Sequence, residues 1–470
     1  MTWLNRQNDK EIEPSTCRQR VQNCLNQIHS CSDLNAFRCV FEDALERAEE
    51  IDQKITQGTA GKLAGMVTAI KDNIVMVNSV STAGSRILQN YSSPYEATVV
   101  TRMLNEDAVI IGKTNMDEFG MGSSTENSAY GPVKNSVHPD YIPGGSSGGS
   151  AVAVAADMAD TALGSDTGGS VRQPAALTGV VGLRPTYGTV SRYGLIAFAS
   201  SLDQIGCLSK NVPDAAILLQ VIAGYDDRDS TSASLPVPDY SSELERDVKG
   251  LRIGIPDEYF GEGLDDEVHQ MVQKAIDRFK EEGASVQRVK LPHTDYGIAT
   301  YYLLCTAEAS SNLARYDGVR YGLRKGGKDG LREMYEKTRS EGFGDEVKRR
   351  IMLGTYVLSA GYYDAYYRKA QKVRTLIRSD YEKAFSKCDV IAGPATPTTA
   401  FKLGEKINDP MSMYLSDIYT VSGPLAGVPA ISIPVGKDAK GLPIGIQLTG
   451  KAFQESELLG TAHWLEKAVN

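Results

Sequence analysis

The sequence predicts a layered α/β fold, and two features of the chain carry that prediction. From residue 63 onward, short β-branched apolar runs alternate with helical stretches, which is typical of strands joined by helices. Strand segments also occur near both ends of this region, so we expect one interleaved domain over residues 1–470 rather than a string of separate domains. With 470 residues, 41% of them hydrophobic, the chain can bury one large core or two to three ordinary ones.

The expected elements follow in order along the chain. Residues 15–54 carry apolar side chains at helical spacing without proline or glycine, so we expect a helical segment over 1–60 that packs on the domain. Further helices are expected over 97–104, 150–159 and 265–282 and through most of 296–388, with a polar surface connection at 226–251. The expected strands are 66–70, 108–111, 161–166, 180–183, 251–255, 285–291 and 390–392, and the strand pair 430–435 and 444–448.

Composition narrows the classes of function. The net charge of −9 argues against the chain binding nucleic acid by itself, because phosphate contacts need a local surplus of Lys and Arg. No signal peptide and no membrane span is expected, since no stretch approaches the ~18 apolar residues that a span requires. Seven cysteines, with Cys17, Cys24 and Cys31 spaced seven apart and Cys39 eight further on, suit helical faces better than a zinc site. We therefore expect free thiols and a cytoplasmic protein.

Two short segments rich in serine and glycine, residues 144–150 and 166–172, are the most informative local feature, and we call them the first and second serine-glycine knots. Glycine lets the backbone approach a substrate closely, and serine offers a hydroxyl nucleophile, so such knots can serve acyl transfer. A helix from about residue 149 would advance roughly 16 Å and the strand 161–166 would return roughly 20 Å. The two knots are therefore predicted to be neighbours in space.

Ser170 is the expected nucleophile, because it follows a short strand through three residues of sharp turn. The backbone amides of Thr167, Gly168, Gly169 and Ser170 are the expected oxyanion donors. Removing one such donor typically costs ~3 kcal/mol of transition-state stabilisation.

Lys71 is the expected base, since none of the five histidines lies in a recognisable catalytic setting. At its ordinary pKa of ~10.4 a lysine is protonated at pH 7, and holding it neutral costs about 4.6 kcal/mol. Burial can supply that shift, and Lys71 ends the apolar run 66–70, where burial is expected. Asp72 would face the other side of the strand.

Simpler interpretations compete with this one. A glycine-serine loop is often only a flexible turn, and a lysine after a strand is often solvated. Residues 144–148 also match the nucleophile elbow of α/β-hydrolases, but no strand precedes them. A phosphate-binding loop lacks its Gly-Lys-Ser/Thr sequence. Asp117, Glu118 and Glu126 could be metal ligands, but without a histidine or regular spacing they are predicted to be surface or loop carboxylates.

The stretch 144–174, with Lys71 located 75 residues before Ser146, resembles the amidase signature family. Within that family, a further set of motifs is similar to the glutamine-hydrolysing subunits of tRNA-dependent amidotransferases. These motifs are 112–119, 123–129, 191–195, 200–206, 349–355 and 413–418. The resemblance runs from about residue 60 to the C-terminus, whereas the first 60 residues match only in helical character.

The resemblance implies a large mixed β-sheet covered by α-helices on both sides. It also implies a catalytic triad in which Lys71 is the base, Ser146 a bridging serine and Ser170 the nucleophile. In the family the peptide bond between Gly145 and Ser146 is cis, which places the Ser146 hydroxyl between the other two groups.

By the same resemblance, glutamine is bound by Tyr301, Arg350 and Asp417. A guanidinium suits the α-carboxylate of glutamine, and a carboxylate suits its α-ammonium. Arg349 is a competing choice, because the sequence does not separate two adjacent arginines.

The implied activity is that of a glutaminase subunit in a carbon–nitrogen ligase that uses glutamine as amido donor. A B-type subunit would use the ammonia, with ATP and Mg²⁺, to convert Glu-tRNA(Gln) to Gln-tRNA(Gln), and would hold most of the tRNA. A small C-type subunit would complete a heterotrimer, and this chain itself would need no cofactor, metal or membrane. The alternatives are a stand-alone amidase for another small amide and a non-catalytic scaffold.

Overall fold

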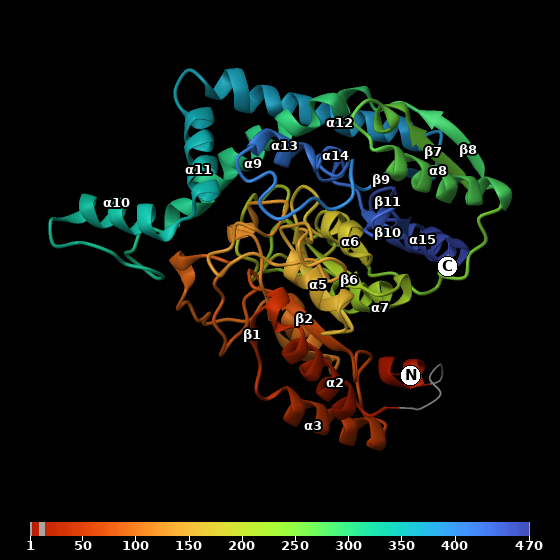
Figure 1. The fold of residues 1–470 in the computed structure, drawn as a ribbon, viewed down its shortest axis with the longest axis horizontal. Coiled ribbons are helices and arrows are strands. Elements are labelled where there is room, and N and C mark those ends of the chain that lie inside the picture. Colours follow the sequence, from red (N-terminus) through yellow and green to blue (C-terminus); the bar gives the residue numbers. More distant parts are fainter. Residues whose placement is uncertain (1, 9–14, 470) are drawn as a thin grey trace.

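The computed structural model describes residues 2–8 and 15–469, and its core is an 11-stranded mixed sheet (Figure 1). The strand order is β1-β3-β2-β4-β6-β5-β10-β11-β9-β7-β8. The strands are β1 (Phe37–Val40), β2 (Val67–Lys71), β3 (Val109–Thr114), β4 (Thr161–Asp166), β5 (Val181–Arg184), β6 (Gln204–Ser209), β7 (Arg252–Pro256), β8 (Ser285–Val289), β9 (Val390–Pro394), β10 (Ala430–Lys437) and β11 (Pro443–Thr449).

Both parallel and antiparallel pairs occur in the sheet. β2 runs parallel to β3 and β4, and β7 runs parallel to β8 and β9, whereas the central strands pair antiparallel. In the register of the β2–β4 pair, Ile70 lies opposite Leu163. The carboxyl ends of β2 and β4 therefore meet at one edge of the sheet.

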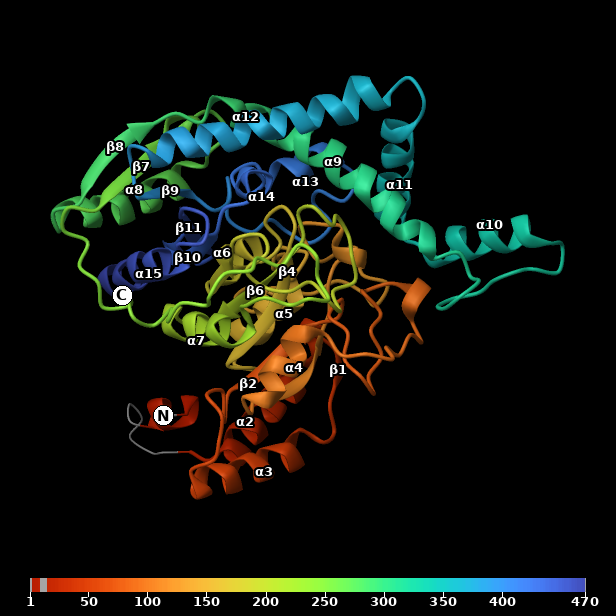
Figure 2. The same cartoon turned by 180° about the vertical axis from the view of Figure 1, so that it is seen from behind.

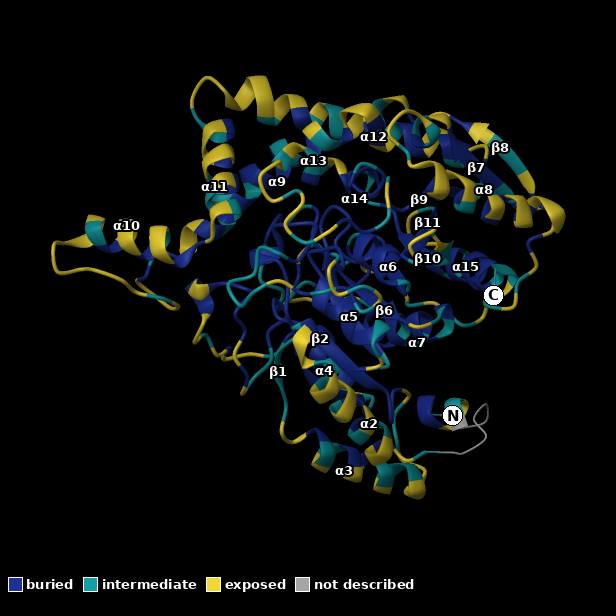
Figure 3. Ribbon diagram, in the orientation of Figure 1, coloured by how far each residue is buried: buried dark blue, intermediate teal, exposed yellow. Residues whose placement is uncertain are grey.

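Helices cover both faces of the sheet. Every position of β2, β4, β6, β9 and β11 is buried (Figure 3), and a strand buried at every position has both of its faces covered. The helices are α1 (Trp3–Asn8), α2 (Cys17–Ser30), α3 (Ala44–Gln57), α4 (Thr98–Asn105), α5 (Gly148–Ala155), α6 (Arg172–Thr178), α7 (Val212–Ile222), α8 (Asp266–Glu281), α9 (Gly297–Asn312), α10 (Leu331–Gly342), α11 (Asp345–Leu358), α12 (Arg368–Phe385), α13 (Pro410–Leu415), α14 (Ser422–Ala426) and α15 (Glu455–Val469). The predicted α/β fold, with a mixed sheet between helical layers, is confirmed.

The N-terminal segment differs from the prediction of helices throughout 15–54. Strand β1 separates α2 from α3 and pairs antiparallel with β3 at the sheet edge. Its sequence, Phe-Arg-Cys-Val, contains aromatic and β-branched side chains that suit a half-buried strand. Cys39 accordingly lies on this strand and not on a helix. All seven cysteines are free thiols, as predicted, and Cys31 and Cys39 are only partly buried.

Strand β6 is the second strand that the sequence analysis did not anticipate, and the helices α7 and α15 were not anticipated either. The other strands match the expected ones to within a few residues. The helix α5 and the strand β4 connect the two serine-glycine knots, and the amide of Ser147 donates to the carbonyl of Ser170 at 3.1 Å. The predicted proximity of the two knots is therefore confirmed.

One part of the chain extends away from the body of the molecule. The long helices α9, α11 and α12 lie together on one side, and the arm that carries α10 projects from them in both views (Figures 1 and 2). Among the described helices, none is long and apolar enough to cross a membrane.

Candidate active site

The site is assembled where β2 and β4 end and α5 begins. Lys71 is the last residue of β2, Ser165 is the second-last residue of β4, and Ser146 and Ser147 directly precede α5. Because β2 and β4 are adjacent and parallel, their last side chains lie close together. The peptide bond between Gly145 and Ser146 is cis, as the family resemblance implied.

The side-chain nitrogen of Lys71 is enclosed by serine oxygens. Its Nζ lies 2.8 Å from Ser146 Oγ, 2.8 Å from Ser147 Oγ, 2.9 Å from Ser165 Oγ and 3.2 Å from the Ser165 carbonyl oxygen. Lys71 is 0% exposed and Ser146 is 1% exposed. The predicted burial of Lys71 and its contact with Ser146 are confirmed.

Burial lowers the pKa of Lys71 to about 7, because the interior disfavours the charged ammonium. The carboxylates of Asp117, Asp166 and Asp203 oppose that shift. Asp72 does not act on Lys71. It accepts hydrogen bonds from the amide and hydroxyl of Thr82 and lies 3.9 Å from Lys113 Nζ.

Ser170 is the most accessible of the three proposed catalytic residues, with 8% of its surface exposed. Within residues 2–8 and 15–469, its hydroxyl hydrogen bonds to no other group, and the contact between Ser146 and Ser170 that a proton relay requires is not formed here. The backbone carbonyl of Ser170 is held by the Ser147 amide. Ser170 is therefore anchored through its backbone, while its hydroxyl has no hydrogen-bond partner among the described residues.

The turn before Ser170 presents three of the four predicted oxyanion donors. Within the described part of the chain, the amides of Thr167, Gly168 and Ser170 have no acceptor, whereas the Gly169 amide donates to Asp166 Oδ1 at 3.0 Å. The Thr420 hydroxyl donates to the Gly168 carbonyl at 2.7 Å and fixes the orientation of that peptide.

Two buried arginines hold the acidic residue at the base of this turn. Arg172 Nε lies 3.0 Å from Asp166 Oδ2, and Arg184 Nη1 lies 3.2 Å from Asp166 Oδ1, with all three side chains fully buried. Burial acts to raise the pKa of Asp166, but the two guanidinium groups lower it to about 2. The carboxylate is therefore ionised at any physiological pH.

The predicted glutamine-binding residues lie around the same turn. A Cβ atom on Gly168 would lie 2.6 Å from the ring of Tyr301, so that ring packs directly against the oxyanion turn. Asp417 accepts a hydrogen bond from the Ser123 hydroxyl, and its other oxygen, Oδ1, is buried without a partner. Burial raises the pKa of Asp417 to about 7. An unpartnered buried carboxylate oxygen is suited to receive the ammonium of a substrate.

The structure shows different surroundings for Arg349 and Arg350. The Arg350 side chain is 3% exposed, whereas that of Arg349 is 44% exposed and pairs with Glu346. Arg350 Nε donates to Glu346 Oε1 at 2.8 Å, and its guanidinium lies 5.1 Å from the ring centroid of Tyr302 and 5.5 Å from that of Tyr414. The nitrogens Nη1 and Nη2 of Arg350 find no acceptor among the described residues. Arg350 is thus the arginine positioned to receive a carboxylate.

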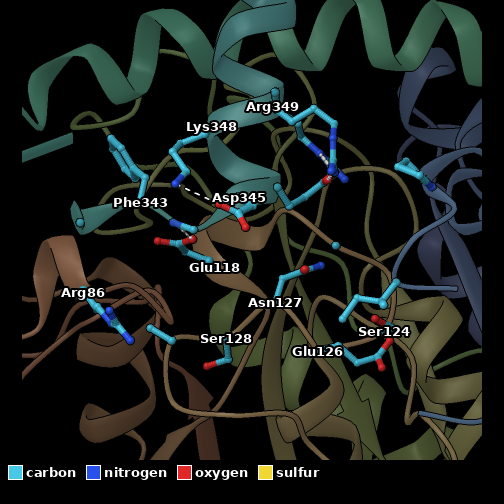
Figure 4. A pocket seen from close by; sticks show the side chains of 18 of the residues that line it. Arg86, Glu118, Ser124, Glu126, Asn127, Ser128, Phe343, Asp345, Lys348 and Arg349 are labelled. Carbon is cyan, nitrogen blue, oxygen red and sulfur yellow. Dashed lines mark hydrogen bonds and ion pairs between the residues drawn. The ribbon is translucent and has the colours of Figure 1, made fainter. Parts of the chain in front are cut away.

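A cavity of about 940 Å³ opens beside Arg350. Figure 4 shows Glu118, Ser124 and Phe343 among the side chains that line it. It lies between the loop that follows β3 and the start of α11, and Glu118, Ser124, Phe343 and Arg350 are part of its wall. Lys71 and Ser170 are not on that wall, so the cavity adjoins the arginine side of the site and not the serines.

Comparisons with known proteins agree with this geometry. The chain matches the amidase family over residues 19–459. The chain belongs to the amidase signature family. It is 59% identical, over 91% of its own length and 87% of the relative's, to the A subunit of glutamyl-tRNA(Gln) amidotransferase from Caldanaerobacter subterraneus subsp. tengcongensis.

Two solved structures share the fold. The A subunit of glutamyl-tRNA(Gln) amidotransferase from Thermotoga maritima is 42% identical to this chain, with a TM-score of 0.79, and the match covers 96% of this chain and 94% of that one. The native peptide amidase of Stenotrophomonas maltophilia is 30% identical, with a TM-score of 0.82, covering 97% and 94%. The fold is therefore shared by an amidotransferase subunit and a peptide amidase.

Asp117 and Glu118 lie in the loop region after β3, as the prediction of surface or loop carboxylates allows, but neither lies at the surface. Both are buried, and Asp117 accepts the amides of Thr125 and Asn127 at 2.9 and 3.1 Å. Glu126 is half-buried and accepts the amide of Gly404. No cluster of three or more metal-ligating side chains occurs in the described parts of the chain.

Sequence reasoning did not identify two of the groups that surround the amidase lysine. Ser147 and Ser165 both contact Lys71, and Asn73 donates to Ser165 Oγ at 2.9 Å. Ser147 could have been noticed, since it belongs to the same knot as Ser146. Ser165 carries no local signal, because only the pairing of β4 with β2 brings it to Lys71.

Proposed function

We propose that the chain is the glutamine-hydrolysing subunit of a glutamyl-tRNA(Gln) amidotransferase. The supporting observation is that Lys71 is fully buried with its Nζ 2.8 Å from Ser146 Oγ. The hydroxyl of Ser170 has no hydrogen-bond partner among the described residues. Arg350 and Asp417 add a preference for a substrate with both a carboxylate and an ammonium. The 59% identity to a relative of that name supports the assignment.

Lys71 acts as the base in its neutral form. A neutral amine donates two hydrogen bonds and accepts one. The carbonyl of Ser165 can only accept, and the Ser147 hydroxyl donates to that same carbonyl at 3.2 Å, so both are acceptors for the amine. Two hydroxyls then remain beside the lone pair of Nζ, those of Ser146 at 2.8 Å and Ser165 at 2.9 Å, and in this proposal the lone pair takes the proton of Ser146.

The reaction proceeds through an ester on Ser170. Ser146 passes its proton to Lys71 and takes the proton of Ser170, whose oxygen attacks the side-chain amide carbon of glutamine. The amides of Thr167, Gly168 and Ser170 stabilise the oxyanion. The C–N bond breaks as the proton returns through Ser146 to the leaving nitrogen, which departs as ammonia. Water then hydrolyses the ester to glutamate by the same proton route.

The ammonia is used by partner subunits in this proposal. A B-type subunit converts Glu-tRNA(Gln) to Gln-tRNA(Gln) with ATP and Mg²⁺, and a small C-type subunit completes the heterotrimer. The acidic charge of this chain, −9, agrees with the tRNA being held mainly by a partner. A cytoplasmic location goes with this proposal, because aminoacylated tRNA is used there.

Replacing the nucleophile tests the mechanism. Ser170→Ala is expected to lower the rate of ammonia release from glutamine by at least ~10³-fold, because no other hydroxyl can form the ester. Ser150→Ala is the matched control, since Ser150 lies in the first knot and bonds to Thr114 rather than to Lys71. A Ser170→Ala chain that releases ammonia at the wild-type rate would contradict the mechanism. A serine-directed reagent that fails to label Ser170 would favour the scaffold alternative.

A stand-alone amidase is the second candidate, favoured by the 30% identity to a peptide amidase. Assays of the purified chain on glutamine and on simple aliphatic and aryl amides, with and without partner subunits, separate the two. Preference for glutamine and activation by partners support the amidotransferase assignment. Faster turnover of simple amides without partners supports the stand-alone enzyme.

A further inference from the structure

A buried carboxylate outside the proposed triad joins the core of the site to the helix that carries Arg350. Glu118 begins the short helix η3 (Glu118–Gly120), is 3% exposed and lies on the wall of the 940 Å³ cavity (Figure 4). One of its oxygens, Oε1, accepts the hydroxyl of Ser85, and the other, Oε2, accepts the amide of Gly344 at 2.8 Å. The three groups come from segments far apart in the sequence.

The carboxylate binds the start of α11, a helix that has no side-chain cap of its own. Gly344 is the N-cap residue of α11 and has no side chain to accept the first helical amides. A Cβ atom at position 344 would overlap Glu118 Oε2, so the carboxylate occupies the space that a capping side chain would take. A negative charge at a helix N-terminus is also favourable. Glu118 therefore binds the N-terminal end of α11 from a distant segment, through the amide of the N-cap residue itself and not through the helical amides that a capping side chain would accept.

The same contact fixes the position of α11 against the catalytic core. Phe119, next to Glu118, packs against Phe343, next to Gly344, with ring centroids 5.7 Å apart. Arg350 follows Gly344 by six residues, or roughly 9 Å along the helix. A shift of the start of α11 would move Arg350 with it, because a helix moves as a rigid element over that length.

We propose that Glu118 is a positioning residue for glutamine: it holds the N-terminus of α11 in place and thereby sets where Arg350 meets the α-carboxylate of the substrate. This inference rests on the proposed function, because it assumes an amino-acid substrate bound by Arg350. Burial of the carboxylate is costly, and it raises the pKa of Glu118 to about 7. The amide of Gly344 and the hydroxyl of Ser85 offset that cost.

Kinetics of the full-length chain, with any partner subunits that co-purify, test the proposal. Glu118→Ala is expected to raise KM for glutamine by about tenfold or more, and Glu118→Gln by less, because the amide keeps one acceptor. The rate at which phenylmethylsulfonyl fluoride labels Ser170 should stay within twofold, since that reagent has no α-carboxylate. Glu341→Gln, an exposed carboxylate on the same cavity wall, is the control and should leave KM unchanged.

Hydrogen exchange gives a second measurement that does not depend on glutamine. Amides 345–350 should exchange faster in Glu118→Ala, while amides of β2 and β4 should keep their protection. An unchanged KM in both Glu118 variants would overturn the proposal, and so would labelling of Ser170 that falls as far as kcat/KM. If the wild-type chain does not hydrolyse glutamine, the proposed function fails, and faster exchange at 345–350 would still support Glu118 as the residue that holds the start of α11.

Discussion

At pH 7 an ordinary lysine is almost entirely protonated, whereas burial lowers the pKa of Lys71 to about 7. The neutral, basic form therefore gains population as the pH rises through 7. We expect kcat for glutamine to rise about tenfold per pH unit below 7 and to level off above ~8. A pH profile of kcat checks this, and a midpoint near the ordinary pKa of ~10.4 would contradict the role of Lys71.

Titration of Asp417 adds a second contribution to the pH dependence. Burial raises its pKa to about 7, so the free enzyme also loses a carboxylate charge as the pH falls through 7. Bound substrate ammonium would keep Asp417 ionised in the complex. Because kcat/KM reports the free enzyme and kcat reports the complex, kcat/KM should fall more steeply than kcat below pH 7.

Asp117 affects the same titration from outside the triad. Its buried carboxylate is the largest of the charges that raise the pKa of Lys71 against the effect of burial. Asp117→Asn removes that charge, so the midpoint of the kcat profile should move to lower pH. Asp72→Asn is the matched control, because Asp72 is next to Lys71 in sequence but bonds to Thr82. An equal shift in both variants would show that the effect is not specific to Asp117.

Helix α11 carries two adjacent arginines with different surroundings. Arg350→Lys keeps the charge but loses the planar fork that can bind a carboxylate through two parallel bonds. Losing a hydrogen bond to a charged group costs about 1.5–3 kcal/mol, so KM for glutamine should rise roughly 10- to 100-fold. Arg349→Lys should leave KM within twofold, since Arg349 is exposed and pairs only with Glu346 among the described residues. A larger effect at Arg349 would reverse the assignment.

The elements that sequence reasoning predicted are those with strong local signals. The strand ending at Lys71 is a buried apolar run, and the knots around Ser146 and Ser170 contain glycines whose conformations few residues share. Gly144, for example, has a φ of +83°. Strand β1 was missed because its short half-buried sequence lies between two helices, and pairing with β3 decides its conformation. Burial of Asp117 and Glu118 was missed because carboxylates are usually exposed, and the amides and the hydroxyl that stabilise these two come from other segments of the chain.

Across the whole molecule, the turn before Ser170 depends on residues from three strands of the sheet that lie far apart in the sequence. Arg172 bonds to Asp166, to the carbonyl of Thr420 and to Gln447 on β11, and Arg184 on β5 bonds to the same Asp166. One buried network therefore links β4, β5 and the C-terminal strand pair. We propose on this basis that residues 1–470 form a single amidase domain.

This network makes a prediction about acid stability. The folded-state pKa of Asp166 is about 2, below its ordinary 3.8, so its stabilising effect is complete above about pH 4 and is lost as the pH falls toward 2. At pH 7, Asp166→Asn should lower the unfolding free energy by about 3–5 kcal/mol, because it leaves two buried guanidinium groups without their charge partner. The difference in unfolding free energy between wild type and variant should decrease by about 2 kcal/mol as the pH falls from 5 to 2.

Urea unfolding followed by fluorescence at several pH values measures both effects. Asp364→Asn is the control, because its carboxylate forms an exposed ion pair with Arg368 and should leave the midpoint unchanged. Since Asp166 Oδ1 also receives the Gly169 amide beside the oxyanion turn, Asp166→Asn should lower kcat even where the protein remains folded. A variant with wild-type kcat and an unchanged urea midpoint at pH 7 would show that the turn is held by other contacts. The network would then be dispensable both for the fold and for the site.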